Sequence, residues 1–162
     1  MTVFIPNTGP DTVSQDVPNL PFFPALNTSD FRTAMRVIEA IPTERVFEEL
    51  QRATLATNRE LHYWRIAHEA AGHADLTAVP ADRYGAQSAL SIHYRQAVFH
   101  RAKAFLIEKS TDFDSTAEGS AQGKDMEPNV EDHFRTVREE IAAILHYEDR
   151  DRNQSGSIVE LI

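Results

Sequence analysis

The sequence predicts an all-α protein: a four-helix bundle-like domain with an extended N-terminal arm and a short C-terminal strand that pairs with a partner. Three observations lead to this class. Apolar residues recur at steps of three and four over several long segments, as they do on the buried face of a helix. Five of the eight prolines fall within residues 1–27, which excludes a long helix there. The last five residues, 158–162, carry the branched apolar side chains typical of a strand.

These patterns divide the chain into an arm over residues 1–27, a helical domain over 28–147 and a C-terminal arm over 148–162. A length of 162 residues suits one domain with a sizeable core. Cysteine is absent, which excludes disulfides and cysteine metal sites. The apolar runs are too short to cross a membrane and the N-terminus lacks the features of a signal peptide, so we expect a soluble protein without a membrane partner.

The formal net charge of −9 argues against general binding to nucleic acid, which requires a basic surface to neutralise phosphates. This charge is unevenly distributed. Residues 110–162 hold thirteen Asp and Glu against five Lys and Arg, whereas residues 82–109 hold two acids against five bases. The basic segment can complement the acidic one within a subunit or between neighbouring copies, and both alternatives remain open.

The N-terminal arm contains the most apolar stretch of the first thirty residues, Leu20-Pro21-Phe22-Phe23-Pro24. Such a stretch is too hydrophobic for a free linker. Two interpretations remain: Phe22 and Phe23 cover the core of their own subunit, or they form a contact with a neighbouring subunit.

Four helices follow in order. The first begins at a cap among residues 27–29 and continues through Ala40, before Pro42. The second begins with Thr43 as its cap and continues to about Ala71, just before Gly72. The third covers about 86–109, and the fourth follows Asn129, a plausible cap, and ends near Tyr147.

Two of these helices carry further signals. The third has two adjacent apolar stripes, which predicts a central position with helices on both sides. Its basic residues, Arg95 and Arg101 among them, are expected to contact acidic surface of the same or the next subunit. The second repeats arginine every seven residues, at Arg45, Arg52 and Arg59, on a face that is either simply solvated or binds a partner.

The histidines and paired aspartates are the candidates for metal chemistry. His68 to His73 resembles the zinc motif H-E-x-x-H but is one residue too long, so we reject it. His93 and His100 share a helix face without an evident third ligand. Asp112 and Asp114 form a D-x-D pair that could hold a divalent ion only with outside help, and turn formation or subunit contact is the simpler role.

No nucleophile motif or phosphate-binding glycine loop is present, so we expect neither an enzyme nor a cofactor. The C-terminal strand has no good partner strand in the chain. Either it adds to a sheet of another subunit or protein, or it folds back onto the bundle as an apolar tail.

Several short segments, in order along the chain, resemble the head-completion protein family of Peduovirus-like contractile-tailed bacteriophages. They are Phe22-Phe23-Pro24, residues 56–61 with Tyr63, Val79 to Asp82, Tyr94 to Val98, Asp112 to Gly119, Arg138, and the ending Ile158-Val159-Glu160-Leu161-Ile162.

The resemblance implies a structural virion protein of the neck, the head-tail interface, assembled in the bacterial host cytoplasm. It implies a head-tail adaptor in a ring of twelve copies beneath the portal protein, which closes the filled head and presents a platform to the next neck or tail-terminator protein. The C-terminal arm, Ser157, Ile158, Val159, Glu160, Leu161 and Ile162, would bind the portal or a neighbour, and DNA would pass through the lumen without specific binding. The alternatives are a tail-terminator or stopper component of the neck and, more distantly, a metal-dependent enzyme.

Overall fold

The computed structural model describes residues 13–114 and 129–148 of the chain. Its helices are α1 (Thr28–Met35), α2 (Thr43–Glu60), α3 (His62–Ala70), α4 (Ala89–Asp114) and α5 (Val130–Leu145), and its strands are β1 (Asp16–Val17), β2 (Leu26–Asn27), β3 (Arg83–Tyr84) and β4 (Gln87–Ser88). The prediction of a mostly helical protein is confirmed. The sequence predicts four helices, whereas the described residues form five helices and two small antiparallel strand pairs.

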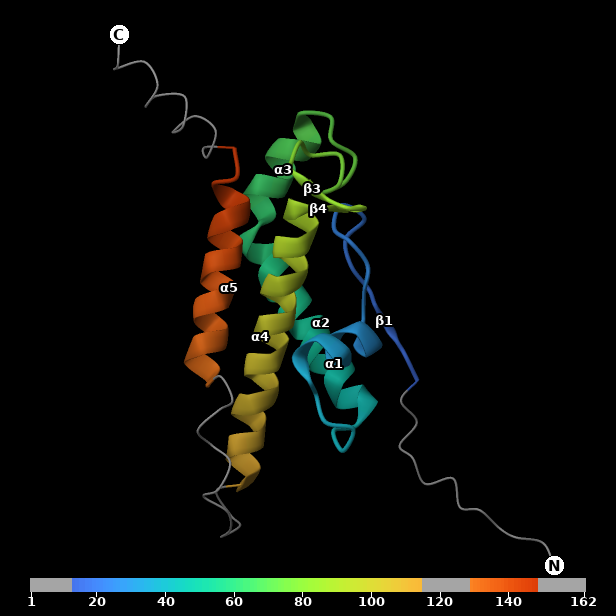
Figure 1. The fold of residues 1–162 in the computed structure, drawn as a ribbon, viewed down its shortest axis with the longest axis vertical. Helices are drawn as coiled ribbons and strands as arrows, with labels where there is room; N and C mark the ends of the chain where they lie inside the picture. Colours follow the sequence, from blue (N-terminus) through green and yellow to red (C-terminus); the bar gives the residue numbers. More distant parts are fainter. Residues whose placement is uncertain (1–12, 115–128, 149–162) are drawn as a thin grey trace, which may run out of the picture.

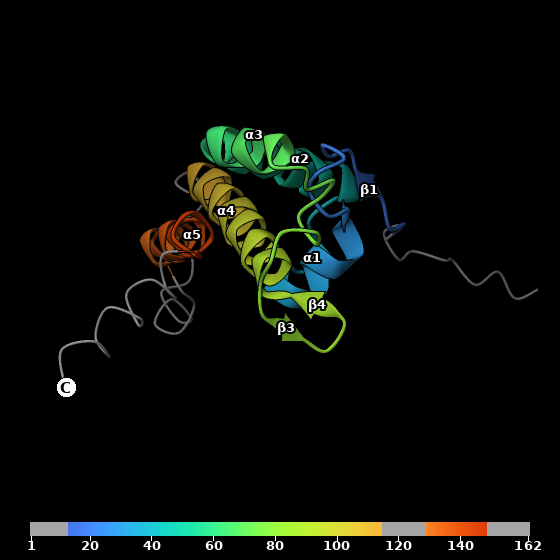
Figure 2. The same ribbon diagram turned by 90° about the horizontal axis from the view of Figure 1, so that it is seen from above.

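Helix α4 is the centre of the molecule. It packs against α5 on one side, against α2 on another and against α1, and Figure 2 shows it lying between the α2–α3 pair and α5. Its buried side chains cover a wide arc, as its two apolar stripes predict: Ala89, Leu90, Tyr94, Ala97, Val98, Phe99, Ala102, Ala104 and Leu106. The predicted central position is therefore confirmed.

Helix α1 begins where the sequence predicts and ends earlier. The side chain of Asn27 caps it by accepting a hydrogen bond from the Asp30 backbone N–H at 2.8 Å. The helix stops because Arg36 adopts a left-handed conformation, with φ 49° and ψ 48°. The Arg32 guanidinium then donates to the carbonyls of Ile38 and Ile41, at 3.1 and 2.5 Å, and holds the connection to α2. The predicted extension of this helix through Ala40 is wrong.

The predicted second helix is divided into α2 and α3 at Leu61. This residue has φ −88° and ψ 6°, and its side chain is fully buried. Bonds of the helical type continue on both sides, from Leu61 N to Thr57 O and from Arg65 N to Leu61 O. No glycine or proline marks the break, so the sequence pattern extends straight through it. The N-cap position is Pro42, one residue before the predicted Thr43.

A hairpin of β3 and β4 delays the start of α4 by three residues relative to the prediction. Its turn contains Gly85 at φ 63°, a left-handed conformation that glycine adopts without strain. The Ala89 backbone N–H then donates to the Asp82 carbonyl at 2.9 Å and closes the entry to the helix.

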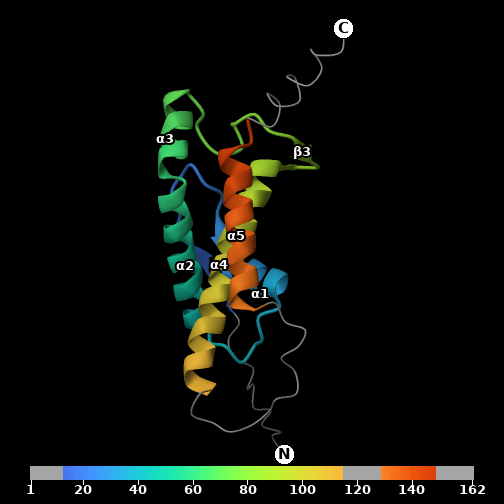
Figure 3. The same cartoon turned by 90° about the vertical axis from the view of Figure 1, so that its left-hand side faces the viewer.

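Helix α5 begins at the predicted cap. The Asn129 side chain accepts from the Asp132 N–H at 2.9 Å, and the Asp132 carboxylate accepts from the Asn129 N–H at 3.3 Å. Its buried residues include Val137, Ile141 and Ile144 of the predicted stripe. Figure 3 shows α5 running along α4, in the same direction as α2 and α3.

Candidate interaction surfaces

The segment before α1 packs on the body of its own chain. Phe22 and Phe23 are 2% and 5% exposed. The Phe23 ring stacks on Tyr94 of α4 with centroids 4.5 Å apart, and Phe22 meets Trp64 of α3 edge to face at 6.2 Å. The first interpretation of these rings, as core residues, is therefore the one that the structure supports, because they have almost no surface left for a neighbouring subunit.

A polar network fixes this segment against the helices. The Tyr94 hydroxyl donates to Asn58 Oδ1 at 2.7 Å, and the Asn19 side-chain amide donates to the Tyr94 hydroxyl at 3.1 Å and to the Pro24 carbonyl at 2.8 Å. Asn58 Nδ2 donates to Asn19 Oδ1 at 2.9 Å and closes the triangle. Burial raises the pKa of Tyr94, so that its hydroxyl stays protonated as a donor.

Two of the basic residues of α4, Arg101 and Lys109, have acidic partners within the subunit. Arg101 is buried, and its Nη1 lies 2.7 Å from Glu60 Oε1 at the end of α2. Lys109 pairs with Glu49, a carboxylate only 1% exposed. Arg95 is half-buried and its Nη2 approaches Gln87 Oε1 at 3.4 Å. The basic segment could contact acidic residues of its own subunit or of a neighbouring copy. Arg101 and Lys109 contact acidic residues of their own subunit.

The two histidines of α4 face α5 and have separate partners. His93 Nδ1 lies 2.5 Å from Glu140 Oε2, and His100 Nδ1 lies 2.9 Å from His133 Nδ1. Burial lowers the pKa of His100, against an opposing effect of the Glu140 carboxylate. A nitrogen-to-nitrogen hydrogen bond requires one of its two atoms to be unprotonated. The His100–His133 hydrogen bond is therefore lost when both Nδ1 atoms carry a proton.

The histidines at the end of α3 form a ring cluster without metal-site geometry. His68 lies against Trp64, with centroids 4.2 Å apart, and 5.5 Å from the His73 ring. Burial lowers the pKa of His68, while Glu148, whose Oε1 lies 3.8 Å from His68 Nε2, opposes this effect. Over residues 13–109 and 129–148, no three His, Asp or Glu side chains are grouped so that they could hold a metal ion.

Several predicted contact residues cannot be placed in a site. Asp112 and Asp114 belong to the last turn of α4, but their side chains lie outside the described part of the chain. Ser157, Ile158, Val159, Glu160, Leu161 and Ile162, the predicted portal-binding arm, lie outside the described residues altogether.

Three exposed apolar residues of α2 and α3 were not predicted from the sequence. Leu55, Tyr63 and Ile66 are 66%, 84% and 43% exposed along the outer side of α2 and α3. Arg59, one of the arginines that repeat every seven residues, is also exposed there, whereas the guanidinium of Arg52 lies 3.9 Å from the centroid of the Phe105 ring of α4. The sequence signal was available: these residues also follow helical steps, on the face opposite the buried stripe.

The geometry therefore defines a structural helical protein whose surfaces can serve contacts. None of its helices, over the described ranges, is long and apolar enough to span a membrane. The family model for the phage head completion protein (GPL) matches residues 17–157. The chain belongs to this family. It is a phage head completion protein, a structural component of the phage head and not an enzyme.

A curated relative agrees with this assignment. The chain is 29% identical over 143 residues to the head completion/stabilization protein of Escherichia phage P2, an alignment that covers 88% of this chain and 83% of the relative. No solved structure matches the chain significantly.

Proposed function

We propose that this head completion protein is a head-tail adaptor. Twelve copies form a ring beneath the portal protein after DNA packaging, close the filled head and present a platform to the next neck or tail-terminator protein. The observation that carries the proposal is the family match over residues 17–157, which includes the helical body and most of the C-terminal third. The adaptor would occupy the neck of the virion.

The division of the chain into parts belongs to the same proposal. Residues 28–147 form the adaptor body, and residues 148–162 form an arm whose end, Ser157 to Ile162, adds as a strand to the portal or a neighbour. Residues 1–27 are proposed as the N-terminal arm, and the part of it that the structure describes packs on the body through Phe22 and Phe23.

The lumen of the ring is proposed to repel DNA. Each copy carries a formal net charge of −9, so a ring concentrates negative charge around a passing duplex. DNA would then move through the ring without adhering to it. Retention of DNA on the isolated ring at low salt measures this property, and tight retention contradicts it.

Deleting Ser157 to Ile162 tests the attachment. We expect the truncated protein to keep the circular dichroism and melting temperature of the full chain, because none of the described core residues is removed. It should no longer attach to the portal protein in a pull-down. Unchanged attachment would refute the role of the arm, and co-purification with tail components in place of the portal would instead indicate a tail-terminator or stopper.

A further inference from the structure

The outer side of α2 and α3 carries an ordered line of exposed side chains. Arg52, Leu55, Arg59, Tyr63 and Ile66 follow one another at helical steps, and we call them the α2–α3 stripe. Tyr63 and Leu55 are among the most exposed large apolar residues of the described chain, at 84% and 66%. Single exposed apolar residues are common on monomers, but several aligned along one helix face indicate an interaction surface.

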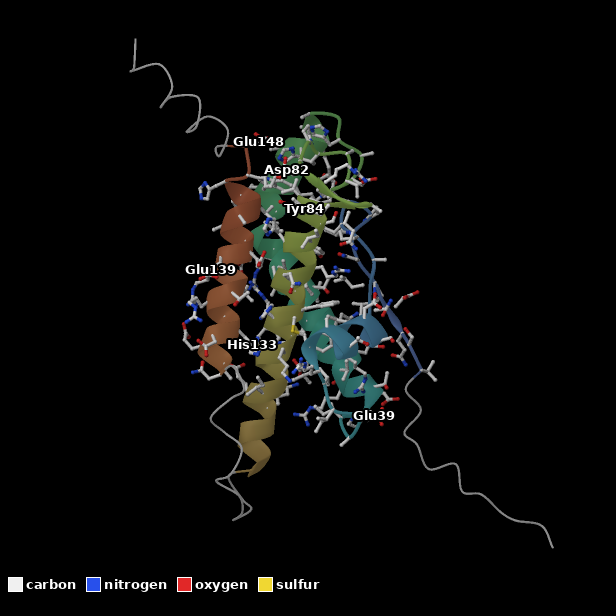
Figure 4. The ribbon with its side chains drawn as sticks, viewed as in Figure 1. Glu39, Asp82, Tyr84, His133, Glu139 and Glu148 are labelled. Atoms are coloured by element: carbon white, nitrogen blue, oxygen red, sulfur yellow. The ribbon has the colours of Figure 1, made fainter. Side chains whose placement is uncertain are left out.

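The outer side of α5 carries a second exposed line. Its members are Glu131, Arg135, Glu139, Ala142 and Leu145, which we call the α5 stripe. Figure 4 marks Glu139 on this helix, and Leu145 at its end is 41% exposed. The carboxylates pair only with arginines of the same helix: Glu131 with Arg138 at 2.7 Å and Glu139 with Arg135 at 3.9 Å. Exposed pairs of this kind are weak and can exchange partners.

The two stripes match in length and direction, and both end on apolar side chains. Each spans about 21 Å, at a rise of about 1.5 Å per residue. Helices α2–α3 and α5 both run opposite to α4 along the long axis, so they are parallel to each other (Figure 1). Both stripes end on apolar residues, although Leu55 stands between the two arginines of the α2–α3 stripe; Ile66 lies fourteen residues after Arg52 and Leu145 fourteen after Glu131.

We propose that the α2–α3 stripe of one copy packs against the α5 stripe of the next copy. In this register Arg59 lies opposite Glu139, while Tyr63 and Ile66 pack on Ala142 and Leu145 of the neighbour. The proposal rests on the ring proposed above and names its subunit contact. Two different surfaces meeting in this way form a heterologous interface, the kind that closes into rings.

Charge favours the α5 stripe of the next copy as the partner of this surface over a second α2–α3 stripe. An antiparallel pair of α2–α3 stripes centred on Arg59 would place the two Arg59 side chains against each other, and like charges at an interface are unfavourable. The α5 stripe belongs to the acidic third of the chain, where residues 110–162 hold thirteen acids against five bases. Arg52 already lies over the Phe105 ring and 3.5 Å from Glu49 Oε2 of its own subunit, so Arg59 is the arginine to which the next copy offers a carboxylate.

Engineered cysteines test the contact, because the chain has none of its own. In the double variant Ile66→Cys/Leu145→Cys, oxidation of the concentrated protein should produce a covalent ladder of dimers and larger oligomers, since a disulfide requires Cα atoms within about 7 Å. Neither single variant should form covalent oligomers. A dimer from Ile66→Cys alone, or no ladder from the double variant, would overturn the proposal. Ile38→Cys/Leu145→Cys is the control, because Ile38 is more exposed than Ile66, 66% against 43%, but lies outside the stripe.

Charge reversal gives an independent readout. Arg59→Glu should weaken self-association several-fold by sedimentation, as should Glu139→Arg, and combining both should restore it. Equal losses without restoration would contradict the pairing. Failure here is distinguishable from failure of the adaptor function: a ring that attaches to the portal without the cross-link leaves the adaptor proposal intact. A chain that forms the cross-link but never attaches to the portal supports the subunit contact and contradicts the adaptor proposal.

Discussion

Replacing Phe22 and Phe23 by alanine should unfold the single chain. Removing one fully buried phenylalanine typically costs about 3–5 kcal/mol. The two rings touch each other, at a centroid distance of 5.3 Å, so their costs do not simply add. A combined loss of about 6 kcal/mol is a large part of the roughly 5–15 kcal/mol that stabilises a typical domain.

Urea denaturation of dilute protein, where self-association is negligible, measures this loss. The matched control is Leu20→Ala, since Leu20 is a neighbour in the same segment that is 41% exposed. Its cost should remain below about 1 kcal/mol. If the double alanine variant kept its midpoint and lost only the ability to self-associate, these rings would be a subunit contact and our account of the core would be refuted.

Three further changes test the interior. Tyr94→Phe removes the hydroxyl that donates to Asn58 and should cost about 1–3 kcal/mol in urea denaturation, and no loss would show that the network is not stabilising. Lys109→Met leaves the buried Glu49 carboxylate without its lysine and should lower the free energy of unfolding by about 2 kcal/mol. The double variant Lys109→Met/Glu49→Leu should regain most of this loss, and no regain would contradict the pairing. The pKa of His100 is lowered in the folded chain, so the unfolded chain binds more protons and stability should fall as pH drops below the ordinary histidine value of about 6.5. The melting temperature of a His100→Asn variant should fall less over the same range, and an equal fall would exclude His100 as the cause.

The helices were predictable because burial imposes a period on the sequence. Of the residues that follow helical steps along α2 and α3, Val46, Leu50, Ala53, Thr57, Leu61 and His68 are buried and Trp64 is half-buried. The caps of α1 and α5 lie where Asn27 and Asn129 indicate. The break at Leu61 and the end of α1 at Arg36 were not predictable. Both depend on backbone angles that neither glycine nor proline signals.

The contacts that hold the elements together were less accessible from the sequence. Asn19 and Tyr94 are 75 residues apart, and His100 and His133 are 33 apart, so no local pattern connects them. The sequence pattern of a helix does not distinguish a polar residue that faces solvent from one that bonds to a distant partner. On the exposed face of α2 and α3, the sequence drew attention only to the repeating arginines. The exposure of Leu55, Tyr63 and Ile66 could be recognised only once the structure showed which face of these helices is buried.

The measurement that tests the adaptor account most directly is the mass and symmetry of this protein bound to its portal protein, by native mass spectrometry and electron microscopy. The account predicts a closed ring of twelve copies, with the α2–α3 side of each copy against α5 of the next. A single copy on the portal, or a complex with the capsid shell that excludes the portal, would contradict it.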